Sequence, residues 1–375
     1  MLKYSKRSSQ LSASQLQQSF EKAKQLQDQG QIDIISLAVG EPYYPTPERI
    51  KQAAIEAIRN NYTKYTPASG SLDLKSKLAQ KYSCLPDQVV ISHGAKIILS
   101  SLLWTLVDHE DQVLISAPYY SPYVEVARSC SGKVILVDTV DHDFQLTAKA
   151  IEEKIVSQNL KPKILIINSP NNPTGAVYAQ AELEKIADLS KRYGFIIIAD
   201  ECYRNFSTNP DFTFRLIDKK AIIVDSCSKT YAMTGWRLGW AICCEELAQR
   251  LNRYFGAYIG SNFSVAEKAA IQALGQPGID DFIKQRQIIF AWLKVSKIPH
   301  VETEGAFYAF ADFSKTMKTT GMNGSVKLAE YFLRQAKVAL SPGIAFGDFD
   351  NYLRISYSVE VETLQEALAR IEKIL

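Results

Sequence analysis

The stretches FIIIADECY (195–203) and AIIVDSCSKT (221–230) share one pattern, a short run of apolar, mostly β-branched residues that ends in polar side chains. Similar apolar runs occur at 87–92, 111–116, 133–138, 163–168 and 240–244. Segments with helical spacing lie between several of them. Short continuous apolar strands that alternate with helices are typical of a mostly parallel sheet covered on both faces. The sequence therefore predicts an α/β fold with a seven-stranded, mostly parallel sheet between helices.

Helices and a second group of strands complete the predicted fold. Apolar residues at helical spacing predict helices at 14–29, 46–60, 71–82, 96–107, 122–130, 179–193, 281–296, 324–336 and 361–374. Strand-like stretches at 305–313 and 352–358 separate the last three helices. We therefore expect a large, sheet-bearing domain over 46–275 and a smaller α+β domain built from both chain ends, 1–45 and 276–375.

Composition places the chain among ordinary globular proteins. Its 375 residues are 46% hydrophobic and 22% charged, and the net charge of +3 argues against a general nucleic-acid binder. No apolar run approaches the roughly 18 residues that span a bilayer, and the N-terminus lacks the apolar region of a secretory signal. We therefore expect a cytoplasmic protein. The six cysteines suit reduced core thiols, and the four histidines lack metal-ligand spacing, so no metal site is expected.

Polar and aromatic residues follow five of the predicted strands. Ligands of open parallel sheets bind at the carboxyl ends of the strands, so these residues are expected to face one crevice. They are Gly94, Ala95, Lys96, Tyr119, Tyr120, Asn172, Asp200, Tyr203, Ser226, Ser228, Lys229 and Arg237. The first three belong to an HGAK stretch that fits a helix N-terminus, where backbone amides bind anions.

Each of these residues alone also has an ordinary interpretation. Lys229 fits a solvated loop lysine, although a desolvated lysine near Arg237 would have a lowered pKa and attack carbonyl groups. Asp200 fits a helix cap or the partner of a buried cation, and Asn172 fits a turn. Arg354 lies in the apolar alternation YLRISYS, where a buried arginine needs an anion. Together, a lysine, an acid, a phosphate-binding arginine and a stacking aromatic are what pyridoxal phosphate requires.

Four longer motifs make this combination specific. They are SPNNPTG (169–175), ADECY (199–203), SKTYAMTGWRLGW (228–240) and LRISYS (353–358). On these motifs the chain resembles the fold-type I, pyridoxal-phosphate-dependent aminotransferases of class I/II, the aspartate aminotransferase superfamily. The stretches LAVGEPYYPTP, KYTPASG and GAFYAF extend the similarity over nearly the whole chain.

The resemblance implies a role for each motif residue. Lys229 would bond covalently to the cofactor pyridoxal 5'-phosphate and later carry the substrate proton, while Asp200 would pair with the ring nitrogen. Tyr203 and Asn172 would hydrogen-bond the phenolate oxygen of the ring, and Tyr120 would stack on its face. The phosphate would be bound by Gly94, Ala95, Lys96, Ser226, Ser228 and Arg237, and, across a homodimer, by Tyr65 and the Ser261–Asn262 pair.

The resemblance also implies how substrates bind. Arg354 would take the substrate α-carboxylate, and Gly40 would lie against the substrate. In one branch of the family, an arginine from the neighbouring subunit holds the distal carboxylate, but Ala257 stands at the matching position here. Lys96 and Ser14 resemble instead a second, mostly bacterial branch, in which a lysine and a hydroxyl serve the acidic side chain.

Transfer of an amino group between an L-amino acid (aspartate, glutamate or an aromatic residue) and a 2-oxo acid is the expected activity. A lyase or synthase, of the carbon–sulfur lyase or aminocyclopropane-carboxylate synthase type, would share Lys229, Asp200 and Arg354, so these residues do not exclude it. A regulatory protein that senses the cofactor would carry an added DNA-binding domain, and we expect no room for one before the predicted fold begins. A nucleotide-binding α/β protein is disfavoured because no GxGxxG follows a predicted strand.

Overall fold

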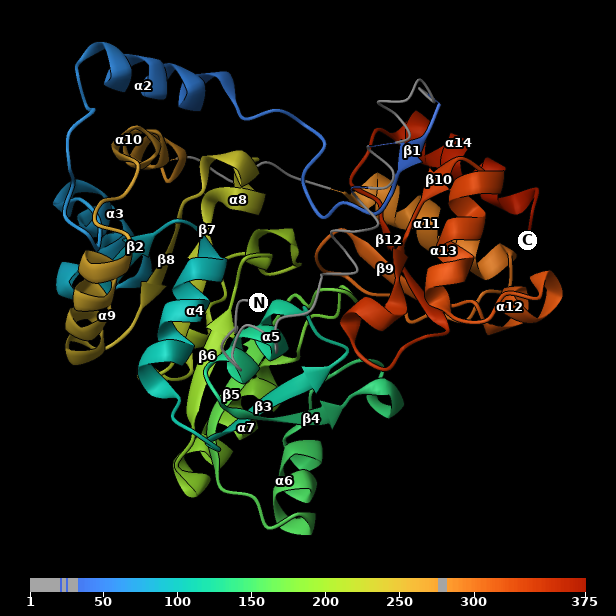
Figure 1. The fold of residues 1–375 in the computed structure, drawn as a ribbon, viewed down its shortest axis with the longest axis horizontal. Coiled ribbons are helices and arrows are strands. Elements are labelled where there is room, and N and C mark those ends of the chain that lie inside the picture. Colours follow the sequence, from blue (N-terminus) through green and yellow to red (C-terminus); the bar gives the residue numbers. More distant parts are fainter. Residues whose placement is uncertain (1–20, 22–24, 26–32, 276–281) are drawn as a thin grey trace, which may run out of the picture.

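A seven-stranded sheet forms the centre of the larger of two lobes (Figure 1). The computed structural model describes residues 21, 25, 33–275 and 282–375. In chain order, the strands of the sheet are β2 (Val89–Ser92), β3 (Gln112–Ala117), β4 (Lys133–Asp138), β5 (Pro162–Asn168), β6 (Ile196–Asp200), β7 (Ile222–Ser226) and β8 (Gly239–Ile242). Their order across the sheet is β2-β8-β7-β6-β5-β3-β4, and only β8 pairs antiparallel with its neighbours. The predicted seven-stranded, mostly parallel sheet is confirmed, strand by strand.

Helices cover both faces of this sheet, as the side-chain alternation along each strand requires. Ile164 and Ile166 of β5 belong to the core shared with α4, α5 and α9, whereas Leu165 and Ile167 belong to the core shared with α3, α6, α7 and α10. The helices of this lobe are α2 (Glu48–Arg59), α3 (Leu72–Tyr82), α4 (Ala95–Leu106), α5 (Pro122–Ser129), α6 (Ala148–Ser157), α7 (Gln180–Tyr193), α8 (Cys227–Thr230), α9 (Glu245–Tyr258) and α10 (Ser264–Ala273).

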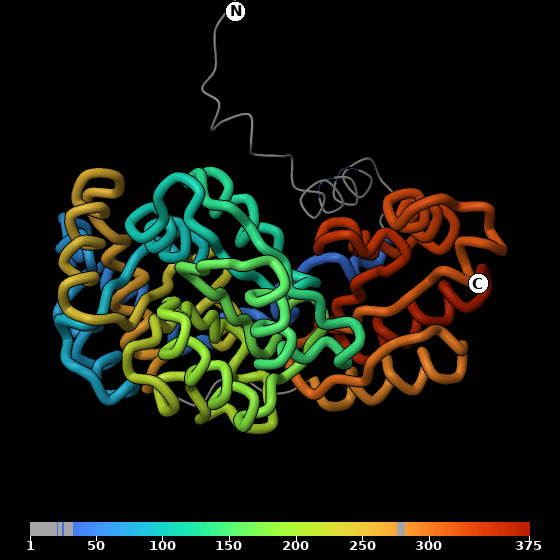
Figure 2. The backbone as a smooth tube through the Cα atoms, turned by 90° about the horizontal axis from the view of Figure 1, so that it is seen from below, coloured from blue at the N-terminus to red at the C-terminus, as the bar shows by residue number. Residues whose placement is uncertain are grey.

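The smaller lobe combines the C-terminal quarter of the chain with the segment that follows Asp33, and Figure 2 shows it at one end of the long axis. Its antiparallel sheet has the order β11-β12-β9, and a separate parallel pair joins β1 to β10. The elements are β1 (Ile35–Ser36), α11 (Ile283–Val295), β9 (Tyr308–Asp312), α12 (Ser314–Thr320), α13 (Ser325–Gln335), β10 (Val338–Ala339), β11 (Ser341–Pro342), β12 (Tyr352–Ser356) and α14 (Val361–Glu372). The core of this lobe also includes Tyr203 and Phe206, which come from the larger lobe.

Several expectations lie beyond what the described residues test. The predicted helix at 14–29 falls outside them except for Glu21 and Gln25. The predicted domain boundary after residue 275 adjoins residues 276–281, which the structure does not describe, so the division stays a prediction. Within the described part of the chain, no helix is long and apolar enough to cross a bilayer.

Candidate active site

A cavity of about 640 Å³ lies at the carboxyl ends of β5, β6 and β7, where the two lobes meet. The sequence-predicted residues that line it are Gly40, Ala95, Lys96, Tyr120, Asn172, Asp200, Tyr203, Ser226, Ser228, Lys229, Arg237 and Arg354. They come from both lobes, and the topology of the sheet accounts for the convergence, because the ends of parallel strands share one edge. The structure therefore gathers in one place side chains that the sequence scatters over more than 300 residues.

Lys229 lies on α8, the short helix that begins where β7 ends. The hydroxyl of Ser226 caps this helix by accepting a hydrogen bond from the Ser228 amide at 3.3 Å. The Lys229 Nζ donates to the Gly40 carbonyl at 2.5 Å, across the junction between the lobes. Burial, with a smaller effect from the nearby cations Arg354 and Arg237, lowers the pKa of Lys229 to about 8. The amine therefore has a neutral, nucleophilic fraction near neutral pH.

Asp200 ends β6 and is 8% exposed. Its carboxylate accepts hydrogen bonds from the Tyr123 hydroxyl at 2.7 Å and from the Cys202 amide at 3.1 Å. No cation of the described residues lies within ion-pair distance of it, and burial raises its pKa. A buried carboxylate in this situation lacks its natural complement, because a nearby positive charge would lower the pKa again.

Arg354 on β12 is 3% exposed and also lacks an ionic partner among the described residues. Its Nη1 donates to Asn172 Oδ1 at 2.9 Å, and its Nη2 donates to the Ala38 carbonyl at 2.6 Å. The guanidinium carbon lies 4.4 Å from the ring centroid of Tyr308, and Nε has no hydrogen-bond partner among the described residues. A buried guanidinium fixed in orientation but bound to neutral groups has donors left for an anionic ligand.

Hydroxyl and amide groups form the wall between Asp200 and Arg354. The hydroxyls of Tyr203 and Tyr308 are 2.6 Å apart. The Tyr308 ring also contacts Arg354, which donates a hydrogen bond to the Asn172 side chain. Tyr308 and Tyr123 were not among the predicted site residues. Tyr308 lies in the GAFYAF stretch, which the sequence shows without a role, and Tyr123 lies one turn beyond Tyr120 on the next helix.

The opposite end of the cavity presents backbone amides and a cation. Gly94 precedes the first turn of α4 with φ +90°, and a Cβ on it would lie 2.9 Å from the Arg237 Nη2. Arg237 donates to the Thr234 carbonyl at 2.7 Å and to the His93 carbonyl at 3.4 Å. The guanidinium is thus held beside the N-terminus of a twelve-residue helix, a combination that suits a phosphate group.

Lys96 lies at the rim of the cavity rather than in its floor. Its side chain is exposed, and its Nζ lies 5.9 Å from the ring centroid of Tyr120. Ser14, predicted as a second contact for an acidic substrate, lies outside the described residues. The placement of Lys96 leaves its ammonium free to turn toward a ligand in the cavity.

Tyr65 and Asn262 do not line the cavity of their own chain. Tyr65 is 93% exposed, which leaves it available to a second copy of the protein. Asn262 is buried, and its Nδ2 donates to the carbonyls of Ala68 and Ile91 at 3.3 and 3.1 Å. In this chain Asn262 therefore fixes the loop after Tyr65 to the end of β2, and its expected contact with a partner's phosphate stays a prediction.

The cavity fits the cofactor that the sequence motifs imply. Pyridoxal phosphate carries an aldehyde, a basic ring nitrogen and a phosphate. The aldehyde matches the Lys229 amine, the protonated ring nitrogen matches the uncompensated Asp200 carboxylate, and the phosphate matches Arg237 with the α4 N-terminus. The fit rests on three groups of the protein itself: a buried amine with a lowered pKa, a buried carboxylate without a cation, and an exposed guanidinium beside a helix N-terminus.

Comparison with known proteins agrees with this interpretation. The family described as aminotransferase class I and II matches residues 32–371. A protein of Aquifex aeolicus named probable aspartate/prephenate aminotransferase is 37% identical over 94% of each chain, and an aspartate aminotransferase of Bacillus subtilis is 30% identical over 100% of this chain and 99% of its own. Among solved structures, the aspartate aminotransferase of Thermus thermophilus with maleate superposes with a TM-score of 0.92 at 29% identity, with both chains fully covered.

The lowered pKa of Lys229 predicts how the cofactor-free protein reacts with pyridoxal phosphate. Only the neutral amine attacks an aldehyde, so the visible band should appear faster as the pH rises, with the midpoint of the rate increase near pH 8. Stopped-flow absorbance would measure this rate. Lys229→Ala should form no borohydride-reducible bond, whereas Lys185→Ala on the exposed face of α7 should react normally. A midpoint near 10.5, or a reducible bond retained in Lys229→Ala, would contradict the assignment.

Proposed function

We propose, from the premise that the chain belongs to the aminotransferase class I and II family, that its preferred substrates are dicarboxylic amino acids and 2-oxo acids. The chain is a pyridoxal-phosphate-dependent aminotransferase. It exchanges an amino group between an L-amino acid and a 2-oxo acid, and the lyase alternative is not favoured by its relatives. The proposal concerns which acids enter the site, and the cytoplasmic location expected from the sequence also stays a prediction.

The buried guanidinium of Arg354, which has no ionic partner among the described residues, is the observation that carries the recognition of carboxylate substrates, and Lys96 adds the preference for a second carboxylate. Every amino acid and 2-oxo acid has a carboxylate next to the reacting carbon, and a planar guanidinium binds it through two parallel hydrogen bonds. Stacking on Tyr308 and the bond to Asn172 hold the plane of Arg354 in place before a substrate arrives. Such fixed geometry would place the α-carbon of a bound substrate between Arg354 and Lys229, which line the same cavity.

Different residues around the cavity would contribute to different parts of amino-group transfer. Pyridoxal phosphate, when bound, supplies a ring that withdraws electrons from the substrate α-carbon. Asp200 would keep the ring nitrogen protonated, and Tyr123 and the Cys202 amide keep the carboxylate oriented. The Lys229 amine, with its lowered pKa, would remove and return the α-proton. Tyr203 lines the cavity and would hydrogen-bond the ring oxygen, and its hydroxyl is held by Tyr308.

Lys96 is the proposed partner of a second carboxylate. Its ammonium lies at the rim, 5.9 Å from the centroid of the Tyr120 ring on which the cofactor would stack. Ala257 cannot supply the side-chain arginine found in other branches. The Thermus thermophilus structure contains maleate, a dicarboxylate, and the Aquifex aeolicus relative is named for aspartate and prephenate. Prephenate is itself a 2-oxo acid with a second carboxylate, so the same pair of cations suits it.

A homodimer is the second part of the proposal. Large apolar side chains are exposed on α2, at the start of α3, at the end of α9 and in the loops after α2 and before α10, namely Ile58, Leu72, Tyr258, Tyr65 and Phe263. These segments are tied together, since the Ser261 hydroxyl accepts from the Thr66 amide and the Ser264 hydroxyl donates to the Tyr62 carbonyl. An apolar surface of this kind is typical of an interface. Pairing of two copies would also give Tyr65 a place at the partner's cofactor.

Replacement of Arg354 by lysine tests the α-carboxylate contact. A lysine keeps the charge but loses the planar fork, so Arg354→Lys should raise KM for every donor and acceptor alike, by about ten- to a hundredfold. Steady-state kinetics with several donors would measure it, with Arg250→Lys on the exposed face of α9 as the control. A loss confined to acidic substrates would show that Arg354 binds the side chain instead.

Replacement of Lys96 tests the second carboxylate. A charge-assisted hydrogen bond contributes roughly 1.5–3 kcal/mol, so Lys96→Ala should lower kcat/KM for aspartate, glutamate and 2-oxoglutarate about ten- to a hundredfold. Aromatic and aliphatic donors should be nearly unaffected, and Lys149→Ala on the exposed face of α6 should behave as the unmodified protein. Equal losses on all donors would place Lys96 at the cofactor, and no loss would refute its part in acid recognition.

The mass in solution tests the dimer. Sedimentation should give twice the chain mass of 42.0 kDa. Phe263→Asp should shift the mass toward a monomer because it places a charge on an apolar surface that pairing would bury. Val156→Asp on α6, also at an exposed apolar position, should leave the mass unchanged. A monomer in the unmodified protein at micromolar concentration would refute this part of the proposal.

A further inference from the structure

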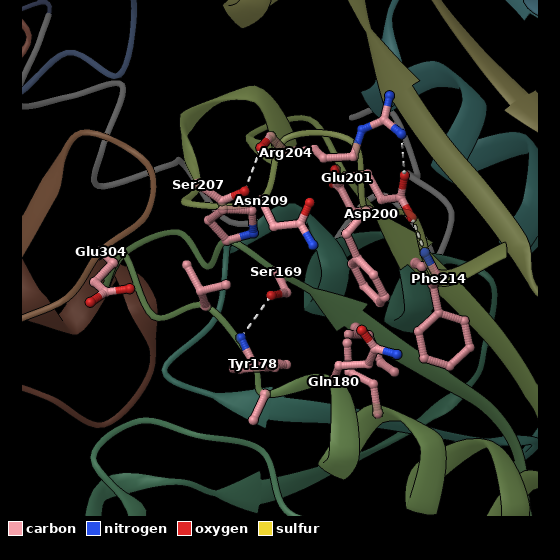
Figure 3. A pocket seen from close by; sticks show the side chains of 17 residues that line it. Ser169, Tyr178, Gln180, Asp200, Glu201, Arg204, Ser207, Asn209, Phe214 and Glu304 are labelled. Atoms are coloured by element: carbon pink, nitrogen blue, oxygen red, sulfur yellow. Dashed lines mark hydrogen bonds and ion pairs between the residues drawn. The ribbon is translucent and has the colours of Figure 1, made fainter. Parts of the chain in front are cut away.

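A buried cluster of charged side chains joins the ends of β6 and β7 beneath the active-site cavity. It consists of Arg204, Glu201, Asp225 and Tyr82, each of them buried, and is called the Arg204 cluster below. Figure 3 shows Arg204 and Glu201 beside Asp200, in the wall of a separate cavity of about 240 Å³. None of these four side chains lines the larger cavity, so the cluster has no direct contact with a substrate there.

One guanidinium in this cluster faces two carboxylates. The Nη1 of Arg204 lies 3.7 Å from Glu201 Oε2, and its Nη2 lies 3.7 Å from Asp225 Oδ2. The Tyr82 hydroxyl donates to the same Asp225 oxygen at 2.8 Å, and the Tyr82 ring lies 5.2 Å from the guanidinium carbon. Two carboxylates from adjacent strands are thus brought together around a single cation. Without that cation, they would be buried charges that repel one another.

Both carboxylates belong to residues next to the reacting groups. Glu201 follows Asp200 directly, and its amide donates to the Val224 carbonyl of β7 at 2.8 Å. Asp225 precedes Ser226 and accepts a hydrogen bond from the Ser226 amide at 2.6 Å. The Ser226 hydroxyl in turn caps α8, which carries the lysine of the site. A short chain of contacts therefore runs from Arg204 to Asp200 in one direction and to Lys229 in the other.

We propose that Arg204 is a positioning residue, which fixes the Asp200 carboxylate and the first turn of α8 relative to each other by holding Glu201 and Asp225 together. A fork of several donors can engage two carboxylates at once, which an ammonium point charge cannot. Placement errors of about 1 Å slow reactions by up to a hundredfold, so a group that sets the distance between Asp200 and Lys229 affects the rate without touching the substrate. This inference rests on the aminotransferase chemistry and not on the proposed preference for acidic substrates.

The charges around Arg204 determine how its loss would change titration. Besides Glu201 and Asp225, the titratable side chains near it are Lys81 and Tyr82 of α3 and Tyr231 after α8. Burial raises the pKa of Glu201 to about 7, and the positive charge of Arg204 acts against this rise. Loss of the cation would raise the pKa of Glu201 further, so Glu201 would take up a proton. The lost positive charge and the neutralised carboxylate then cancel, so the total charge of the cluster changes little.

The experiment compares Arg204→Lys and Arg204→Met with matched variants of Arg192, an arginine that pairs with Glu152 at the surface. Each holoenzyme is measured for its melting temperature, its affinity for pyridoxal phosphate, the pH midpoint of its visible band, and its single-turnover rate. The donor is whichever one the unmodified protein uses fastest. We expect both Arg204 variants to lower the rate about ten- to a hundredfold and to weaken cofactor binding. The pH midpoint should stay unchanged in both Arg204 variants, which would assign the losses to positioning rather than to charge, and the Arg192 variants should change none of the four quantities.

Two results would overturn the proposal. The first is a lower melting temperature with the cofactor affinity and the single-turnover rate both within about twofold of the unmodified protein, which would show that Arg204 only stabilises the fold. The second result comes from Asp225→Asn, a variant that can be measured even if Arg204→Met does not fold. Asp225→Asn keeps Arg204 but weakens the connection that runs from Arg204 through residue 225 to Ser226. An unchanged single-turnover rate in Asp225→Asn would refute the link. These measurements can be interpreted even if the protein has no preference for acidic donors, because they use whichever donor reacts fastest with the unmodified protein.

Discussion

The active site depends on the parallel pairing of β6 with β7, in which Asp200 lies opposite Val224. This register places the last residue of β6 beside the strand whose end begins α8, so the carboxylate and the lysine face the same cavity. A shift by one residue would turn each side chain of one strand to the opposite face of the sheet and separate the two groups. Continuous apolar packing on both faces, by Ile198 on one side and Ile197 on the other, opposes such a shift.

The protein keeps charges buried in the cavity without pairing them internally. Asp200 has hydrogen bonds but no cation, and Arg354 has hydrogen bonds but no carboxylate among the described residues. Both groups line the same cavity, but no ion pair joins them. Burial of unpaired charge is unfavourable in the free protein, and that unfavourable energy is relieved when a ligand of opposite charge binds. The same groups that cost stability therefore provide the selectivity for a cationic ring and an anionic substrate.

The sequence predicted the seven strands and most of the cavity lining, because apolar strands and strand-end motifs are local patterns. It did not predict β10 and β11, since two-residue strands are too short to show any periodicity. Tyr123 and Arg204 were missed for a different reason. Their importance lies in contacts with Asp200 and Asp225, which are 77 and 21 positions away, and neither residue differs locally from an ordinary helix or turn residue. For Asn262 the opposite holds. The sequence motif identified it as a candidate site residue but did not predict its hydrogen bonds to the carbonyls of Ala68 and Ile91.

The segment from Ala38 to Gly40 links the binding groups of the two lobes. Its carbonyls accept hydrogen bonds from Arg354 at one end and from Lys229 at the other, at 2.6 and 2.5 Å. The space against Gly40 is already filled, because a Cβ there would collide with the Tyr308 hydroxyl. Lys229 and Arg354 therefore each donate a hydrogen bond to the same backbone segment. A ligand that bonds to the Lys229 nitrogen would remove the hydrogen bond to Gly40. Because the same segment accepts a hydrogen bond from Arg354, a change at the cofactor would alter a segment that also contacts the carboxylate-binding arginine.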